Sequence, residues 1–214
     1  MQVNENGGGS HSIPLGQWRD GIFDCCSLGV CHQQFCTGLW LTPIALGQVL
    51  TRMKLDWSAS PVVDTSPTEE LTGKQAAWSA FKIMFAIFVA YEVLSNFLYY
   101  VTLPFVSGHY DESGVYYPPQ NIPLWAVVFD AIRQALGIAY GLFILMITLR
   151  TRAYIRHKYS IPEKRCSGCE DCCCSFWCGP CTVCQMARHT ADYRQYKASC
   201  CTETGLDLEA PEVV

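Results

Sequence analysis

Residues 76–106 have the sequence AAWSAFKIMFAIFVAYEVLSNFLYYVTLPFV, and this stretch decides the fold. Between Ile83 and Val106 it carries one charged side chain, Glu92. As an α-helix this part is about 36 Å long, which is enough to cross a hydrocarbon core of about 30 Å. We therefore expect a first transmembrane helix over residues 76–106.

A second apolar block covers residues 122–150, with the sequence IPLWAVVFDAIRQALGIAYGLFILMITLR. It contains Asp130 and Arg133, and no further charge follows until Arg150. We expect a second transmembrane helix over 122–149. The alternative is a pair of buried helices in a soluble bundle, but helices this long and this apolar on every side are typical of membranes. The predicted fold is an all-α membrane protein with two transmembrane helices and Cys-rich segments on both sides of them.

The composition excludes two other classes of protein. Hydrophobic residues make up 50% of the chain and charged residues only 16%, which argues against disorder. The net charge of -4, with Lys and Arg dispersed, argues against nucleic-acid binding. A third apolar stretch, 38–50, is too short to span a membrane and contains Pro43, so we expect a short helix at the membrane interface there, with a re-entrant turn as the alternative.

The positions of Lys and Arg predict the orientation, because cytosolic loops carry an excess of these residues. The segment 107–121 has none, whereas basic residues precede the first predicted helix and follow the second. We therefore expect 107–121 to be extracellular and both termini to be cytosolic. The cytosolic parts are then a flexible tail (1–17), a Cys-containing segment (18–75), a basic Cys-rich segment (150–198) and a C-terminal tail (199–214). The expected inner aromatic belt consists of Trp78, Tyr154 and Tyr159.

All 14 cysteines lie outside the two predicted membrane helices, on the side expected to be cytosolic. Because the cytosol keeps thiols reduced, we expect no disulfide framework. Metal binding, lipid attachment and redox chemistry remain as uses for these thiols.

The densest cluster is CSGCEDCCCSFWCGPCTVC, residues 166–184. The three-residue spacing of its last cysteines predicts a stripe of thiols on a helix that begins near Pro180. Zn²⁺ and Cd²⁺ take up to four thiolate or imidazole ligands in tetrahedral array. The predicted metal ligands are Cys178, Cys181, Cys184, Cys172, Cys169 and Cys166. S-palmitoylation is the alternative use for residues 172–174 and for Cys25 and Cys26.

Two stretches of the chain carry a family resemblance. The first runs Trp18-Arg19-Asp20-Gly21-Ile22-Phe23-Asp24-Cys25 and continues with Cys31, Cys36, Pro43 and Gly47. The second consists of Arg150, Arg152, Tyr159, Ile161, Asp171, Cys172, Phe176, Cys178, Cys181, Cys184, Gln185 and Arg188. In this order they resemble the placenta-specific-eight-like cysteine-rich family, which includes cornifelin, plant cadmium-resistance proteins and cell-number regulators. Residues 55–122 have no counterpart in these two signatures.

The resemblance implies a small plasma-membrane protein, with Cys25, Cys31 and Cys36 as its N-terminal Cys motif. In some members such a protein exports or tolerates zinc and cadmium. In others it supports calcium influx or restrains cell proliferation.

Ionisable residues inside the predicted helices indicate an ion path. Glu92 and Asp130 would each cost about 2.5 to 3.5 kcal/mol to insert, so such groups usually face a partner or a wet path. Two helices cannot enclose a pore, so we expect a homo-oligomer with Gly137 and Gly141 at the contact between copies. The predicted function is an oligomeric zinc, cadmium or calcium exporter or channel, with thiols that capture the ion and Zn²⁺ as the expected ligand or cargo. The structural alternative is that Asp130 and Arg133 neutralise each other and that Glu92 pairs with Arg133 of the neighbouring helix.

The competing hypothesis is a palmitoylated scaffold that regulates growth or a partner channel without transport. The basic run after the second helix would then bind anionic lipid headgroups. An enzyme is not expected, because no carboxylate or orienting group is placed to complete a thiol nucleophile site. The sequence also contains no nucleotide-binding loop.

Overall fold

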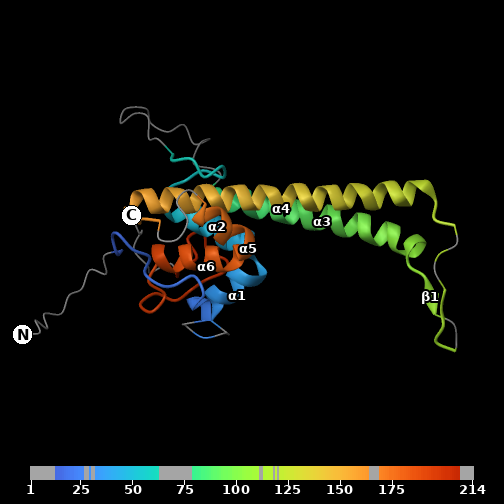
Figure 1. Cartoon of the computed structure of the whole chain (residues 1–214), viewed down its shortest axis with the longest axis horizontal. Helices are drawn as coiled ribbons and strands as arrows, with labels where there is room; N and C mark the ends of the chain where they lie inside the picture. Colours follow the sequence, from blue (N-terminus) through green and yellow to red (C-terminus); the bar gives the residue numbers. More distant parts are fainter. Residues whose placement is uncertain are drawn as a thin grey trace, which may run out of the picture.

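A hairpin of two long helices projects from a group of shorter helices in the computed structural model of the chain (Figure 1). The structure describes residues 13–26, 29, 32–62, 79–110, 113–117, 119, 121–163 and 169–207. The hairpin consists of α3 (Ala80–Val106) and α4 (Leu124–Lys158). At its far end, β1 (His109–Tyr110) and β2 (Tyr116–Tyr117) form a short antiparallel pair.

Both hairpin helices are long and apolar enough to cross a membrane, and both are largely uncovered. Only 17% of the most apolar window of α3 and 11% of that of α4 is buried inside the molecule. The core helix of a soluble protein would be mostly buried, so this exposure favours a membrane-spanning hairpin. The predicted all-α fold with two apolar, membrane-length helices is confirmed to that extent.

The inner end of the hairpin differs from the sequence prediction. The second helix was expected to end at 149, but α4 continues without a break to Lys158. Beyond Leu149 its side chains alternate between exposed and buried, and Thr151, Arg152 and Ile155 are buried against the shorter helices. Packing on a domain, rather than membrane burial, therefore extends this helix.

Two helices replace the single one expected over 38–50. They are α1 (Gln33–Trp40) and α2 (Thr42–Arg52), joined at Leu41, which has non-helical backbone angles. Nearly every residue of α2 is buried, so α2 is a core helix and the predicted interfacial position is wrong. Gly47 allows this packing, since a Cβ there would lie 3.1 Å from the Cα of Phe81 in α3.

The remaining helices are the short 3₁₀-helix η1 (Asp24–Cys26), α5 (Glu170–Trp177) and α6 (Gly179–Thr190). Together with α1, α2 and the inner ends of α3 and α4 they enclose one hydrophobic core, which includes Leu46, Leu50, Met84, Ile155 and Met186. Tyr159, expected in the inner aromatic belt, belongs to this core and is only 7% exposed. Trp78 of that belt lies outside the described residues.

Specific contacts fix how these helices run relative to the hairpin. The amide of Phe81 donates to Oγ1 of Thr51 at 3.1 Å, and Gly47 faces Met84, so α2 is antiparallel to α3. The junction between α1 and α2 therefore lies on the hairpin side of the domain. In α6, Gln185 contacts Arg152 and His189 contacts Tyr159, so the N-terminal end of α6 also lies on that side.

Large exposed aromatic side chains occur at these hairpin-side ends. Trp40 at the end of α1 is 78% exposed, and Phe176 and Trp177 at the end of α5 are 66% and 83% exposed. Trp57 is 45% exposed and lies against Phe143 of α4, with ring centroids 6.4 Å apart. We call Trp40, Trp57, Phe176 and Trp177 the aromatic collar, because they lie around the place where the hairpin leaves the domain.

Candidate functional site

Arg152 of α4 is the centre of a polar network inside the domain. Its side chain is only 2% exposed. Nε donates to Oδ1 of Asp171 at 2.9 Å, and Nη1 donates to Oε1 of Gln185 at 2.7 Å. The guanidinium also lies 4.5 Å from the ring centroid of Trp18, within cation–π range. Buried charges are stable only when paired and hydrogen-bonded, and each of these partners contributes to that.

The N-terminal stretch docks on α6 through Asp20. Nε2 of Gln185 donates to the Asp20 carbonyl at 2.8 Å, and Nε of Arg188 donates to Oδ2 of Asp20 at 3.1 Å. Arg188 also donates from Nη2 to the carbonyl of Gly21 at 3.1 Å. The two signatures noted in the sequence are thus brought together in space: the residues around Trp18 hold those between Asp171 and Arg188.

His189 closes this network as a neutral imidazole. Its Nδ1 accepts a hydrogen bond from the Arg19 amide at 3.2 Å, and its ring meets the rings of Trp18 and Tyr159 edge-on. Burial lowers the pKa of His189 to about 4, with a further contribution from the nearby charge of Arg19. Nε2 is buried with no hydrogen-bond partner among the described residues. His189 is therefore a packed core residue rather than a solvated one.

Two basic residues near the end of α4 face the interior of the domain. Besides Arg152, Arg156 pairs with Asp171 at 2.8 Å and with Glu163 at 3.0 Å, and its side chain is 11% exposed. Residues committed to internal ion pairs are not available to anionic lipid headgroups. In the competing scaffold hypothesis the basic run would bind lipid headgroups; the structure shows Arg152 and Arg156 in ion pairs within the chain instead, while Lys164 and Arg165 lie outside the described residues.

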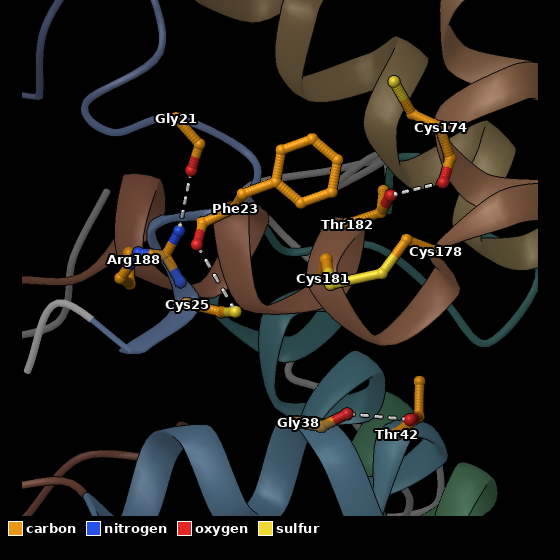
Figure 2. The surroundings of a disulfide bond; sticks show 10 residues. All are labelled: Gly21, Phe23, Cys25, Gly38, Thr42, Cys174, Cys178, Cys181, Thr182 and Arg188. Atoms are coloured by element: carbon orange, nitrogen blue, oxygen red, sulfur yellow. Dashed lines mark hydrogen bonds between the residues drawn. A yellow bond between two sulfur atoms is a disulfide. The ribbon is translucent and has the colours of Figure 1, made fainter. Parts of the chain in front are cut away.

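Cys178 and Cys181 form a disulfide, contrary to the expectation that the thiols are all reduced (Figure 2). Cys178 is the N-cap of α6 and Cys181 follows in its first turn. This places their Cα atoms 5.3 Å apart, within the range that a disulfide requires. Two of the three thiols in the expected stripe are therefore joined to each other and are not thiolate ligands in this state.

The third thiol of the stripe, Cys184, is buried against α1. A Cβ added to Gly38 would overlap its Sγ, so the absence of a side chain at Gly38 makes room for this sulfur. Burial raises the pKa of Cys184 to about 11. Cys184 is thus a protonated, packed side chain.

The other predicted ligands are not gathered around one point. Cys169 and Cys172 are exposed at the start of α5, and Cys166 lies outside the described residues. Within the part of the chain that the structure describes, no group of three or more His, Cys, Asp or Glu side chains could hold a metal ion. The five described members of the predicted ligand set, Cys169, Cys172, Cys178, Cys181 and Cys184, are therefore not assembled into a metal site in this state.

The N-terminal Cys motif is only partly described. Cys25 lies in η1, where its Sγ contacts the carbonyl of Phe23 at 3.7 Å, and Cys36 lies in α1. Figure 2 shows Cys25 beside Arg188, on the same side of α6 as the disulfide. Cys31 lies outside the described residues.

The two carboxylates of the expected ion path lie at different levels of the hairpin. Oδ1 of Asp130 pairs with Arg133 at 2.8 Å, which is the neutralising arrangement considered above. Glu92 is exposed near the middle of α3, and Oε2 accepts a hydrogen bond from Asn96 at 3.2 Å. Because Tyr91 stacks on Tyr140, ten positions along α4 from Asp130, the two carboxylates lie about 15 Å apart along the hairpin.

The two glycines predicted at an oligomer contact have different surroundings. A Cβ at Gly137 would lie 3.6 Å from Oη of Tyr91, so Gly137 faces α3 of its own chain. A Cβ at Gly141 would meet nothing within 4 Å. Of the two glycines, only Gly141 therefore faces open space.

Sequence reasoning missed the role of the signature residues as one buried network. Trp18, Asp20, Asp171 and Arg188 were recognised by their order in the chain, not by their contacts. A usable signal was present, because charged residues that recur beside the cysteines of two distant segments suggest complementary pairs. The Cys-Gly-Pro-Cys spacing at 178–181 likewise fits a disulfide at the start of a helix.

Comparison with known proteins agrees with this arrangement. The PLAC8 family model matches residues 18–189, from Trp18, which packs on Arg152, to the buried His189. The chain belongs to the PLAC8 family. The match includes residues 55–122, for which the two signatures offered no counterpart.

A curated relative supports the same family locally. Cell number regulator 11 of Zea mays is 53% identical over 34 residues, which is 16% of this chain and 20% of that protein. The chain thus spans about a fifth of the length of this relative. No solved structure matches.

Proposed function

We propose that this PLAC8 protein is an oligomeric plasma-membrane protein that moves divalent metal ions, with Glu92 on the ion path. The observation that carries the proposal is the exposed carboxylate of Glu92 at the middle of a membrane-length helix. Both termini are then cytosolic, and the β1–β2 end of the hairpin is extracellular.

Glu92 needs a partner outside the hairpin. Among the described residues, no Lys, Arg or His forms an ion pair with it, and Asn96 supplies a neutral hydrogen bond. An ionised carboxylate facing lipid at this depth costs about 2.5 to 3.5 kcal/mol. Association of hairpins would cover Glu92 and place several copies of it around one axis, where carboxylate oxygens suit a divalent cation.

Asp130 has a different role from Glu92 in this proposal. Its ion pair with Arg133 and its bond from Gln134 at 2.7 Å leave it already neutralised within the chain. In this proposal Asp130 stabilises the outer part of α4, and Glu92 is the residue that the ion meets. Exposed thiols on α5, such as Cys172 and Cys173, supply soft ligands for zinc or cadmium at the inner side.

The test is the zinc and cadmium content of metal-loaded yeast, measured by elemental mass spectrometry with surface expression checked. Cells would express the wild type, Glu92→Gln or the control Glu203→Gln, which removes a carboxylate from the surface of the domain. We expect the wild type and the control to change the metal content equally and Glu92→Gln to have no effect. An unchanged metal content with the wild type would refute transport of these ions.

A second function, that of a palmitoylated scaffold, is favoured by the surroundings of α5. Cys172 and Cys173 are exposed on a helix that ends in Phe176 and Trp177 of the aromatic collar. Acyl chains attached there would add to the membrane anchor. Thioester capture should recover the wild type but not Cys172→Ser/Cys173→Ser, with Cys200→Ser/Cys201→Ser as the control. If the first double variant loses its membrane-domain partition while the wild type leaves the metal content of the cells unchanged, the scaffold function replaces transport.

A further inference from the structure

The disulfide between Cys178 and Cys181 stands at the N-terminus of α6, a helix of 12 residues. The residues between the two sulfurs are Gly179 and Pro180, and the proline occupies the first turn, where its missing amide hydrogen costs nothing. Both cysteines are half-buried, whereas every residue from Thr182 to Thr190 is buried. The pair therefore lies at the accessible end of an otherwise enclosed helix.

We propose that Cys178 and Cys181 are a thiol–disulfide exchange site whose substrates are low-molecular-weight thiols and their disulfides. The function of the pair is separate from ion movement through the hairpin and does not rest on it. Three features support the proposal: the bond between the two residues, their place at a helix N-terminus and the packing of the next thiol, Cys184, against Gly38.

The exchange is balanced by two molecules of a small thiol. The thiolate of the first attacks Sγ of Cys178, the bond to Cys181 breaks, and the Cys181 sulfur leaves as a thiolate that takes up a proton. A second small thiolate then attacks the small-thiol sulfur of the mixed disulfide and releases Cys178. The protein gains two electrons and two protons as a dithiol, and the two small thiols become one disulfide.

The helix determines which sulfur reacts with the outside. Cys178 is the N-cap of α6, so it stands nearer than Cys181 to the positive end of the helix dipole, although its side chain makes no capping hydrogen bond in the disulfide state. The dipole stabilises a thiolate at that position, as in Cys-x-x-Cys redox proteins. Cys178 is therefore the sulfur that forms and breaks the bond to a small thiol. Cys181 is the resolving thiol, which displaces the small thiol from Cys178.

The surrounding thiols do not compete with the pair. Cys184 follows Cys181 by one turn, but burial raises its pKa to about 11 and its sulfur lies against Gly38. Burial also raises the pKa of Cys174, whose carbonyl accepts a hydrogen bond from Thr182 at 3.0 Å. Protonated thiols are poor nucleophiles, so Cys174 and Cys184 do not displace either sulfur of the pair.

The cytosolic position proposed for α6 favours a reversible disulfide over a structural one. On the topology proposed above, α6 lies in the cytosol, where disulfides are usually transient and catalytic or redox-sensing rather than structural. A half-buried pair at a helix terminus is accessible to the small thiols of that compartment. The disulfide is thus one state of a reversible couple.

The first test equilibrates the full chain in lipid nanodiscs with reduced and oxidised glutathione at a series of ratios. Acid quenching, differential alkylation and peptide mass spectrometry then measure the dithiol fraction at Cys178 and Cys181. We expect one reversible two-electron transition, in which the dithiol-to-disulfide ratio changes tenfold for each 30 mV or so. Cys172→Ser/Cys173→Ser should give the same curve. A pair that stays entirely oxidised or entirely reduced across the series would overturn the proposal.

The second test assigns the reacting sulfur. With Cys181→Ser, oxidised glutathione should form a mixed disulfide with Cys178, because no resolving thiol remains. With Cys178→Ser, we expect at least tenfold slower adduct formation at Cys181, since it lacks the N-cap position. Equal rates in the two variants, with folding of both verified by circular dichroism, would contradict the assignment of Cys178.

Discussion

Arg152 and Asp171 join the membrane hairpin to the Cys-rich helices through a bond of 2.9 Å between residues 19 positions apart in the chain. Asp171 also pairs with Arg156 at 2.8 Å, so one carboxylate compensates two guanidinium groups on successive turns of α4. Because Asp171 lies in the first turn of α5 and α6 follows α5, this carboxylate fixes the start of the Cys-rich helices against the hairpin.

Asp171→Asn should destabilise the domain strongly. The substitution leaves the buried Arg152 without a counter-charge, and breaking a buried pair in this way costs about 3 to 5 kcal/mol. Denaturant unfolding of the domain in detergent, followed by near-ultraviolet circular dichroism, measures the change. Glu203→Gln removes an ion pair with Lys82 whose side chains are 41% and 48% exposed, and it should cost less than about 1 kcal/mol. Equal losses in both variants would contradict the assigned role of Asp171.

His189 should make the stability of the domain depend on pH between about 6.5 and 4. Its pKa is about 4 in the folded protein and 6.5 when exposed, so the unfolded chain binds more protons in this window. Stability should therefore fall as the pH decreases from 6.5 to 4 and remain constant, as far as this residue is concerned, above 6.5. The free energy of unfolding of the wild type and His189→Gln, measured across this range, isolates the contribution. A slope that the substitution leaves unchanged would show that other groups cause it.

Gly38→Ala should disturb the contact between α1 and α6. A Cβ at this position would overlap Sγ of Cys184, and both residues lie in the packed interior. We expect a loss of about 1 to 3 kcal/mol, as for other overpacked cores. Gly141→Ala, in open space on α4, should be neutral for the folding of one chain. If Gly141 instead lies between copies, its substitution by Leu should shift the oligomer distribution seen by native mass spectrometry.

The cysteines should differ sharply in their rate of alkylation. Burial raises the pKa of Cys184 to about 11, so little thiolate is present near pH 8, whereas Cys172 and Cys173 are exposed. We expect Cys184 to react with iodoacetamide at least about tenfold more slowly than the thiols on α5. Peptide mass spectrometry after timed quenching gives the rates. Comparable alkylation rates at Cys184 and at the α5 thiols, measured in the native protein, would contradict the packing of Cys184 against Gly38.

The aromatic collar should contact the bilayer. Trp40 and Trp177 lie on the hairpin side of the domain and are 78% and 83% exposed, and tryptophan favours the membrane interface. In nanodiscs, brominated lipids should quench the fluorescence of each residue, measured in variants that retain one tryptophan at a time. Trp18, packed on Arg152 inside the domain, is the matched control and should not be quenched. Equal quenching of all three would contradict the orientation.

The two helices of the hairpin could be predicted from the sequence, because membrane helices are identified by composition alone. Glu92 is one charge in a long apolar stretch, and no tertiary contact alters that signal. The inner boundary was wrong because α4 leaves the membrane and continues into a protein core, where Thr151 and Ile155 are again buried. Hydropathy does not distinguish those two environments at a helix end.

The candidate site was harder to predict because its geometry is made by distant residues. Asp20 and Arg188 are 168 positions apart, and nothing in their spacing shows that they pair. The disulfide was missed for a different reason: thiols in a reducing cytosol were expected to be free, and the spacing of Cys178 and Cys181 was interpreted as part of a stripe of metal ligands. The spacing of the two cysteines favours a disulfide, whereas a reducing cytosol disfavours one. The structure contains the disulfide.

The continuity of α4 has a mechanical consequence. Its 35 residues form one rod about 52 Å long, with no break between the apolar stretch and Arg152. A tilt or rotation of this rod within the bilayer must carry Arg152 with it, and with Arg152 the carboxylate of Asp171 and the start of α6. Movement of the apolar stretch of α4 would therefore reach the Cys-rich helices through this ion pair, because the helix has no break between Leu124 and Lys158.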